Sequence, residues 1–446
     1  MHKFRNIYVL LTLLALTTFL SCSNTPSKIT ITPNDPTIAV SATQQFTATA
    51  HYSYLFGNTK TEDITSSVTW SSGTTTVATI DTKGLATGLA SGTTTITATY
   101  ESISASTSLV VGGTATAADV YVAGYYNDGS NDIAAIWKIA NGGTPTKINL
   151  PDDSLGSHAN SVYVSGTDVY VAGYYNDGSN DIAAIWKIAN GGTPTKINLP
   201  DDSLGSHANS VYVSGTDVYV VGYYNDSSNM IAVLWKNGVK ADLTVTGSNA
   251  VANSVYVSGT DVYVVGNMYS GFNSAPTIWK NGVKTDITTL YTYSEANSVY
   301  VSGTDVYVAG RHNGGPSISA SVWKNGTVTD LPIMVNDAGA NSVFVNGNDV
   351  YVAGYYNYLG TDTAALWKNG VRTDLSVVDP LLEYAHANSV YVSGTDVYVA
   401  GTYSPNDGSC NNLAAIWKNG ARTNLSVADP SLNSAQANSV YVDLHY

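Results

Sequence analysis

The stretch Ser161–Gly173 reads SVYVSGTDVYVAG, and it decides the fold of most of this chain. Valine and tyrosine alternate on either side of a Ser-Gly-Thr turn, which is the pattern of two short strands joined by a tight hairpin. Close copies recur to the end of the chain, each with one tryptophan, at intervals of 44 to 50 residues. These residues are Trp137, Trp186, Trp235, Trp279, Trp323, Trp367 and Trp417. Such a period indicates an array of repeated structural units.

Each unit contains four candidate strands. In the unit that starts at Ser161, Ser161–Val164 and Asp168–Gly173 are followed by Ala183–Trp186 and Thr195–Leu199. In five copies the third and fourth strands are joined by Lys-Asn-Gly, as at 236–238, and Asn-Gly is the signal of a type I′ hairpin. Four short strands in a unit of this length predict the blade of a propeller.

The two ends of the array predict how it closes. It starts at a second strand, Asp119–Val122, and it ends on a first strand, Asn438–Val442. Neither end is a whole blade, but together they make one, and closing the ring also hides sheet edges. We therefore expect a seven-bladed β-propeller over residues 119–446, closed by the C-terminal strand. Residues 119–167 and 168–216 are identical, so these two repeat units are copies of each other.

Residues 28–111 predict a separate β-sandwich, because short alternating runs are separated by turn residues. The segments 64–72 (ITSSVTWSS), 77–81 (VATID), 84–88 (GLATG) and 91–98 (SGTTTITA) resemble the bacterial Ig-like group 2 family. That resemblance implies a spacer or adhesion module on a bacterial surface, with Trp70 in its core. The whole chain is then all-β, with an Ig-like sandwich, a linker at 112–118 and the propeller.

The N-terminal segment reads as an export signal. Lys3 and Arg5 precede the apolar run Ile7–Leu20, which is short for a membrane span. The run ends in Phe-Leu-Ser-Cys at 19–22, which resembles a lipobox. Residues 1–21 are thus expected to be a lipoprotein signal peptide, with Cys22 lipidated and 22–27 a tether. The alternative is an ordinary signal peptide with a coincidental cysteine.

The composition limits the kinds of partner that this protein can bind and the places where we expect it in the cell. Only 12% of the residues are charged and the formal net charge is −14, which argues against a nucleic-acid surface. The second cysteine, Cys410, is expected to be a lone thiol, so no intrachain disulfide forms if Cys22 carries lipid. We expect a monomer in the cell envelope, at the outer membrane or cell surface, that touches the membrane only through its lipid anchor.

The repeats also resemble known extracellular repeats. The run Val306–Gly310 resembles the kelch repeat, with one glycine where kelch has two, and Ala364–Leu375 (AALWKNGVRTDL) resembles bacterial HAF-type repeats. Both resemblances imply a propeller and say little about chemistry.

Comparison of the copies points to one face for function. The turns between strands one and two and between three and four are nearly constant, whereas the loops two-to-three and four-to-one vary. Variable loops on a fixed scaffold commonly carry binding. The alternative is drift on an idle face. The predicted ligand contacts are His158, His207, Glu295, His312, Tyr356, His386 and Tyr403.

Several of these residues allow other interpretations. The position two before a repeated asparagine holds His158, His207, Val251, Glu295, Gly339, His386 and Gln436, a ring that could bind a metal or transfer protons. The asparagine itself (160, 209, 253, 297, 341, 388 and 438) is expected to be structural, binding loop amides at a strand start. Tyrosine pairs in the loops could stack on sugars or pack between blades. The loop Asn127–Asp132 has oxygen ligands for Ca²⁺, although it also fits an ordinary turn.

The sequence therefore predicts a surface lipoprotein that binds or adheres to a protein or glycan ligand, with no required cofactor and no catalysis. It contains no nucleophile elbow, phosphate loop or zinc spacing. Two alternatives stay open: a propeller lyase or glycosidase acting on polysaccharide, and a purely structural cell-surface component.

Overall fold

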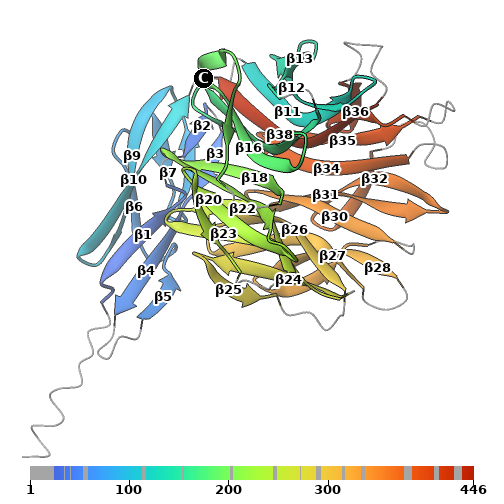
Figure 1. Cartoon of the computed structure of the whole chain (residues 1–446). Helices are drawn as coiled ribbons and strands as arrows, with labels where there is room; N and C mark the ends of the chain where they lie inside the picture. The colour runs from blue at the N-terminus through green and yellow to red at the C-terminus, as the bar shows by residue number, and fades with distance from the viewer. Residues whose placement is uncertain are drawn as a thin grey trace, which may run out of the picture. The chain divides into compact units, whose positions relative to one another are not determined.

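The computed structural model describes residues 25–34, 36–40, 42–53, 59–112, 117–152, 155–200, 204–244, 249–271, 273–287, 293–313, 317–332, 337–375, 384–405, 411–425 and 434–445. The predicted signal peptide, Cys22 and Cys410 lie outside these residues. The chain forms two compact units, divided between Thr114 and Ala115, and each is described by itself (Figure 1). No helix within the described ranges is long and apolar enough to cross a membrane.

The first unit is built from ten short strands in three sheets, with the strand orders β1-β4-β5, β2-β10-β9-β6 and β3-β8-β7. The strands are β1 (Lys28–Thr32), β2 (Thr37–Ala39), β3 (Thr43–Gln45), β4 (Thr47–Ser53), β5 (Thr59–Asp63), β6 (Thr69–Ser72), β7 (Ala78–Ile80), β8 (Leu85–Gly88), β9 (Gly92–Tyr100) and β10 (Ile103–Gly112). Alternate residues along them are buried, which is the two-residue period of a strand with one covered face.

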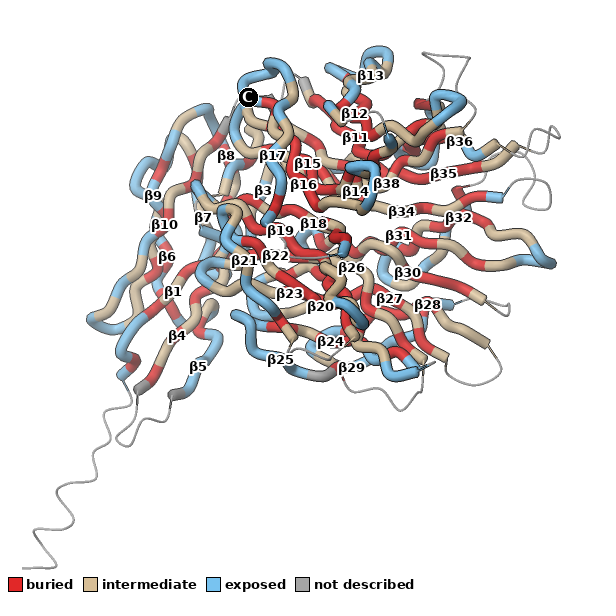
Figure 2. Tube along the Cα trace, viewed as in Figure 1, coloured by how far each residue is buried: buried red, intermediate tan, exposed pale blue. Residues whose placement is uncertain are grey.

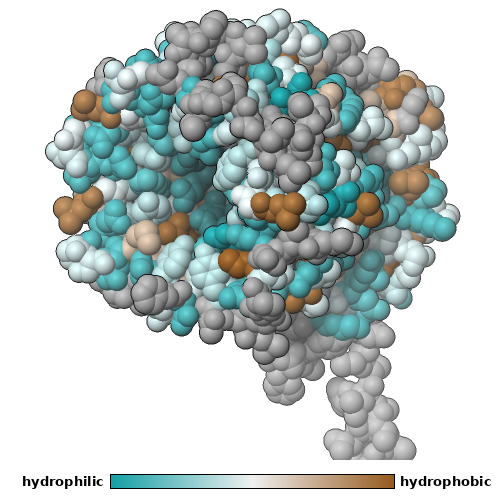
Figure 3. Space-filling view, turned by 90° about the vertical axis from the view of Figure 1, so that its right-hand side faces the viewer, coloured by the Kyte–Doolittle hydropathy of each residue, from teal (hydrophilic) through white to brown (hydrophobic). Residues whose placement is uncertain are grey.

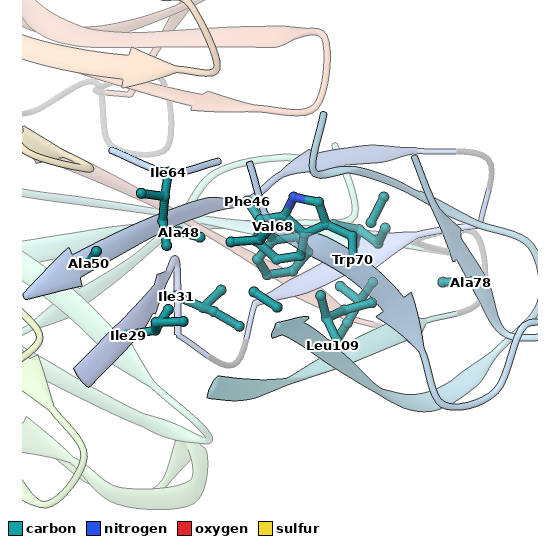
Figure 4. Close-up of a cluster of buried hydrophobic side chains, with 14 of the residues drawn as sticks. Ile29, Ile31, Phe46, Ala48, Ala50, Ile64, Val68, Trp70, Ala78 and Leu109 are labelled. Carbon is teal, nitrogen blue, oxygen red and sulfur yellow. The ribbon is translucent and has the colours of Figure 1, made fainter. Parts of the chain in front are cut away.

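One hydrophobic core holds this unit together. Phe46 is fully buried and its ring centroid lies 6.3 Å from that of Trp70 (Figure 4). The Trp70 indole Nε1 donates to the backbone oxygen of Thr65 at 2.9 Å, so the polar atom of the ring is satisfied inside the core. This arrangement confirms the prediction that Trp70 is a core residue.

The second unit consists of seven four-stranded antiparallel sheets, the blades. The first strands are β38 (Ser434–His445), β14 (Ser157–Ser165), β18 (Ser206–Ser214), β22 (Asn249–Ser258), β26 (Ser294–Ser302), β30 (Ala338–Asn346) and β34 (Tyr384–Ser393). The second strands are β11 (Ala117–Asn127), β15 (Asp168–Asn176), β19 (Asp217–Asn225), β23 (Asp261–Ser270), β27 (Asp305–Asn313), β31 (Asp349–Tyr358) and β35 (Asp396–Ser404).

The outer half of each blade holds the shorter strands. The third strands are β12 (Asp132–Ala140), β16 (Asp181–Ile188), β20 (Met230–Lys236), β24 (Asn273–Lys280), β28 (Ile318–Lys324), β32 (Thr361–Lys368) and β36 (Leu413–Lys418). The fourth strands are β13 (Thr146–Asn149), β17 (Thr195–Asn198), β21 (Val239–Asp242), β25 (Val283–Asp286), β29 (Thr327–Asp330), β33 (Val371–Asp374) and β37 (Ala421–Asn424), and a 3-10 turn η1 (Ala189–Gly191) precedes β17. Burial is concentrated in the inner strands, whereas the fourth strands and turns are exposed (Figure 2).

The first blade has the strand order β13-β12-β11-β38, so the last strand of the chain completes it. β38 pairs antiparallel with β11 from Ala117 opposite His445 to Asn127 opposite Ser434. This pairing confirms the predicted closure and the seven-bladed propeller.

Strand one is longer than the sequence predicted, because it begins at Ser157 rather than Ser161. The pairing of β14 with β15 shifts register between Ala159 and Ser161, which is a β-bulge. The bulge brings the partner backbone so close that a Cβ on Gly173 would lie 2.0 Å from the oxygen of His158. Only glycine fits there, which explains the glycine that ends the Val-Tyr-Val motif in every blade.

Strand one is the innermost strand. One aromatic residue from each first strand contacts the next around a closed ring, with neighbouring ring centroids 4.8 to 5.0 Å apart. The ring consists of Tyr163, Tyr212, Tyr256, Tyr300, Phe344, Tyr391 and Tyr441. Burial, and to a lesser extent neighbouring tyrosine hydroxyls, raise the pKa of Tyr163 and Tyr256 well above the ordinary value.

Candidate functional site

The antiparallel order places the loops two-to-three and four-to-one on one side of the propeller, which we call the loop face. The turns one-to-two and three-to-four lie on the other side, the turn face. Figure 3 looks on the side toward which the loops point in Figure 1, and hydrophilic side chains predominate there, with hydrophobic ones scattered.

The turn face is fixed by repeated local bonding. Asn237 has a φ of 50° and its Oδ1 accepts a hydrogen bond from the Val218 amide at 2.8 Å. Its Nδ2 donates to Asp217 at 2.7 Å, and Lys236 pairs with the same carboxylate. The equivalents Asn281, Asn325, Asn369 and Asn419 repeat this arrangement. The predicted Asn-Gly hairpins are therefore confirmed, and the constancy of this face has a structural cause.

The repeated asparagine ring also has a structural role, but a different one from the one expected. Asn160 lies inside β14, at the bulge, and its Nδ2 donates to the backbone oxygen of Ala208 in the next blade at 3.0 Å. All seven asparagines make the same bond to the following blade. The prediction that they bind loop amides at a strand start was wrong, because the bulge places them within the strand and turns them toward the neighbouring blade.

A belt of side chains surrounds the axis nearer the loop face, and we call it the mouth belt. The first strands contribute His158, His207, Val251, Glu295, Gly339, His386 and Gln436, and the residues opposite them on the second strands are Tyr174, Tyr223, Asn267, Arg311, Tyr355, Thr402 and Tyr125. The belt therefore brings together four of the seven predicted contacts: His158, His207, Glu295 and His386.

Five rings of the mouth belt form one continuous stack across three blades. His158 lies between Tyr125 and Tyr174, with centroid distances of 3.8 and 4.9 Å. His207 lies between Tyr174 and Tyr223 with the same two spacings. Because the ring faces within the stack cover one another, these tyrosines pack between blades. Of the two interpretations of the tyrosine pairs, packing is the one this stack supports.

Each stacked histidine is paired with an aspartate of the preceding blade. The Nε2 of His158 lies 3.2 Å from Asp132, and that of His207 lies 3.1 Å from Asp181. Burial lowers the pKa of both imidazoles, and the nearby carboxylates oppose this effect only in part. Both rings are therefore mainly neutral at pH 7. His386 has the same kind of partner, with Asp362 at 2.8 Å.

The opposite side of the belt holds an ion pair. Arg311 Nε donates to Glu295 at 2.7 Å, and its other nitrogens donate to the hydroxyls of Tyr293 and Tyr355. The Tyr293 hydroxyl donates to Glu295 at 2.7 Å. The guanidinium is thus engaged by a carboxylate and two phenols, and the charges of this cluster cancel.

The other three predicted contacts are not on the ligand-accessible surface, so this part of the prediction was wrong. His312, Tyr356 and Tyr403 are only 2 to 3% exposed. Their side chains bond within the blades: His312 lies 2.7 Å from Asp330, and Tyr356 donates to Asp374. The second strands extend through these positions, and each residue follows a belt position by one, so the two-residue period sends it to the opposite side of the sheet.

The described residues do not gather a metal site. No cluster of three or more His, Cys, Asp or Glu side chains occurs within the described ranges, and the Tyr174 ring separates His158 from His207. In the loop considered for Ca²⁺, Asp128 accepts from the backbone amides of Ser130 and Asn131. Both bonds go to its Oδ1, which therefore serves an ordinary turn.

Two cavities open beside the loops of blades one to four. The first, of about 350 Å³, lies between blades one and two and is lined by Asn127, Asp132, Leu155, His158 and Asp181, among others. The second, of about 400 Å³, is lined by Leu204, Asn249 and the loop Asn225–Met230. The sequence predicted neither cavity, because each joins segments from two different repeats.

Residues 27–111 match the bacterial Ig-like domain (group 2) family, in agreement with the resemblance of this segment. A curated relative, ice-binding protein 1 of Shewanella frigidimarina (strain NCIMB 400), is 42% identical over 95 residues, which are 21% of this chain and 10% of that protein. The chain thus matches only a tenth of the length of that relative.

Solved structures similar to the chain are distant. TolB from Acinetobacter baumannii is 13% identical, with a TM-score of 0.41, and the match covers 72% of this chain and 82% of that one. An acylaminoacyl peptidase of Pyrococcus horikoshii is 12% identical, with a TM-score of 0.36, and 82% of this chain matches 57% of it. A thermostable family-43 glycoside hydrolase is 11% identical, with a TM-score of 0.31, over 50% of this chain and 94% of that one.

Proposed function

We propose that this protein is a binding or adhesion module of the bacterial cell envelope, lipid-anchored through Cys22, that takes its ligand on the loop face of the propeller. The observation that carries the proposal is the contrast between the two faces. Equivalent positions of the mouth belt hold His, Val, Glu, Gly and Gln, whereas the turn face repeats one bonding pattern from blade to blade. A scaffold that is constant on one side and varied on the other suits recognition.

Other features support a location in the cell envelope but do not identify the ligand. The Ig-like domain is compatible with a spacer, and the repeats resemble extracellular ones. The ice-binding name of the curated relative refers to a much longer protein, so we do not extend that activity to this chain. A lyase or glycosidase is a weaker proposal, because Glu295 and the aspartates beside the belt are engaged by Arg311, His158, His207 and His386.

The experiment that tests the proposal compares arginine substitutions on the two faces. Leu155 and Leu204 line the loop-face cavities and are 51% and 64% exposed, while Val239 and Val371 lie beside turn-face hairpins and are each 70% exposed. The purified protein is screened on glycan arrays and on surface-protein extracts. Leu155→Arg and Leu204→Arg should weaken any binding found, and Val239→Arg and Val371→Arg should not. The reverse pattern would contradict a ligand site on the loop face.

A further inference from the structure

The two loop-face cavities lie beside the same two-to-three loop of the repeat. Asn127, Ser130 and Asn131 of the first correspond to Asn225, Ser228 and Asn229 of the second, two blades further on. An exposed leucine lines each, Leu155 in the first and Leu204 in the second. The two-to-three loop of the blade between them, Asn176–Asp181, has the same sequence as Asn127–Asp132, because residues 168–216 repeat residues 119–167. The loop edge of blades one to three thus repeats one type of loop, and a recess lies beside it at both ends of this series.

The chemistry of the recess excludes several ligands. Amides, hydroxyls and carboxylates line both cavities, and no lysine or arginine is among the described residues that do so. In the first cavity the carboxylates of Asp132 and Asp181 carry negative charge, and the one basic side chain among the described residues that line it, His158, is mainly neutral. An anionic ligand such as a polyuronate would therefore meet repulsion, while a ligand with neutral hydroxyl groups finds both donors and acceptors.

A protein partner fits this surface poorly. Protein interfaces are anchored by aromatic and arginine side chains in a desolvated centre. Here both faces of His158, Tyr174 and His207 are covered by neighbouring rings, and Arg311 is already bound to Glu295. One leucine in each recess gives an apolar wall of the size of a sugar ring's CH face rather than of an interface core.

We propose that the recesses of blades one to three bind successive units of a neutral, linear glycan. The inference rests on the proposed function of the loop face and adds the class of ligand and its repeated engagement. Sheets packed face to face typically lie about 10 Å apart, a spacing comparable with a disaccharide in an extended chain. Once one unit is bound, the next binds from a high effective concentration, so affinity grows with chain length.

The test uses the full mature chain from Cys22 and length series of linear neutral oligosaccharides, namely gluco-, xylo-, manno- and N-acetylglucosamine series, from disaccharide to octasaccharide. Oligogalacturonates of matched length are the anionic comparison. Titration calorimetry should show affinity for one neutral series rising at least about tenfold from the shortest to the longest member, and no binding of the oligogalacturonates.

The variants make the test specific to the recesses. Leu155→Arg should lower the affinity for the longest oligosaccharide about tenfold by removing one linked contact, and adding Leu204→Arg should lower it further. Leu359→Arg is the matched control, because Leu359 is 77% exposed on the β31–β32 hairpin at the loop face, outside both cavities. It should leave the affinity unchanged.

Failure of the glycan proposal can be told apart from failure of the proposed function of the loop face. Absence of binding to every neutral series, or affinity independent of chain length, would overturn the glycan proposal. A protein ligand sensitive to Leu155→Arg would overturn it while supporting the proposed function. Glycan binding lost in Val239→Arg but retained in Leu155→Arg and Leu204→Arg would overturn both.

Discussion

The Nδ2 of Asn438 donates a hydrogen bond to the backbone oxygen of Ala159 at 2.9 Å, across 279 residues of sequence. The same bond joins the internal blades, as in Asn253 with Ala296 at 2.8 Å. A matching set of serines accepts bonds from the next blade, and it too closes, from Val162 to Ser439 at 3.3 Å. The junction between the two chain ends is therefore built like the junctions within the chain.

This equivalence gives a matched pair of variants. Asn438→Ala and Asn253→Ala each leave a carbonyl oxygen between blades without its partner, at a cost of about 1–3 kcal/mol. Urea denaturation should give the same loss of free energy of unfolding for both, within about 0.5 kcal/mol. If Asn438→Ala were neutral while Asn253→Ala destabilised the protein, the closing junction would be open in solution.

Removal of the closing strand should have a larger effect. Without residues 437–446, blade one loses most of β38, its inner strand, and β11 becomes an exposed edge. We expect the propeller to lose cooperative unfolding, or to unfold at a sharply lower temperature by calorimetry. A truncated chain that unfolded like the intact one would refute ring closure.

The sequence predicted the blades because each strand has a local residue pattern, and it predicted their closure because the two ends of the repeat array form one split blade. Alternating valine and tyrosine fix the strands, and the split blade at the two ends fixes the ring. The extension of strand one to Ser157 was missed because the bulge before Ser161 breaks the alternation. The burial of Tyr356 and Tyr403 was missed because the sequence does not show that the second strands run past their glycines.

The mouth belt could be predicted only in part. The ring of residues two before the asparagine was found by comparing the copies, and His158, His207, Glu295 and His386 do lie in it. The stacking of Tyr174 on His207 joins second and first strands of different blades, and no spacing within one repeat encodes it.

The glycine after the Val-Tyr-Val motif offers a test of the bulge. A Cβ on Gly310 would lie 1.9 Å from the backbone oxygen of Glu295, so Gly310→Ala must displace one strand and should cost more than about 3 kcal/mol. Gly326 lies in a turn at a φ of 82°, and a Cβ added there would meet nothing within 4 Å, so Gly326→Ala should cost only about 1–2 kcal/mol of strain. Similar costs measured by urea denaturation would contradict the close approach.

Membrane attachment can be tested separately from ligand binding. If the lipobox-like run is processed, Cys22 is acylated and Cys22→Ala should move the protein from the membrane to the soluble fraction. Fractionation followed by immunoblotting measures this. Unchanged membrane retention of Cys22→Ala would exclude the lipid anchor, and it would leave the ligand proposals untouched.

Because the stacked histidines are buried, we expect them to make the protein less stable as the pH falls. The pKa of His158 and His207 is lowered in the folded chain, so the unfolded chain binds protons more readily. Their contribution is fully present above the ordinary pKa of 6.5 and is lost as the pH falls through the lowered folded values. The melting temperature should therefore fall between pH 7.5 and pH 5.

Replacing His158 and His207 by glutamine, which is neutral throughout, should lower stability at pH 7.5 but flatten this pH dependence. Asn281→Ala, on the turn face, should lower stability and leave the slope unchanged. An unaltered slope in the double variant, measured by calorimetry, would show that other groups cause the loss.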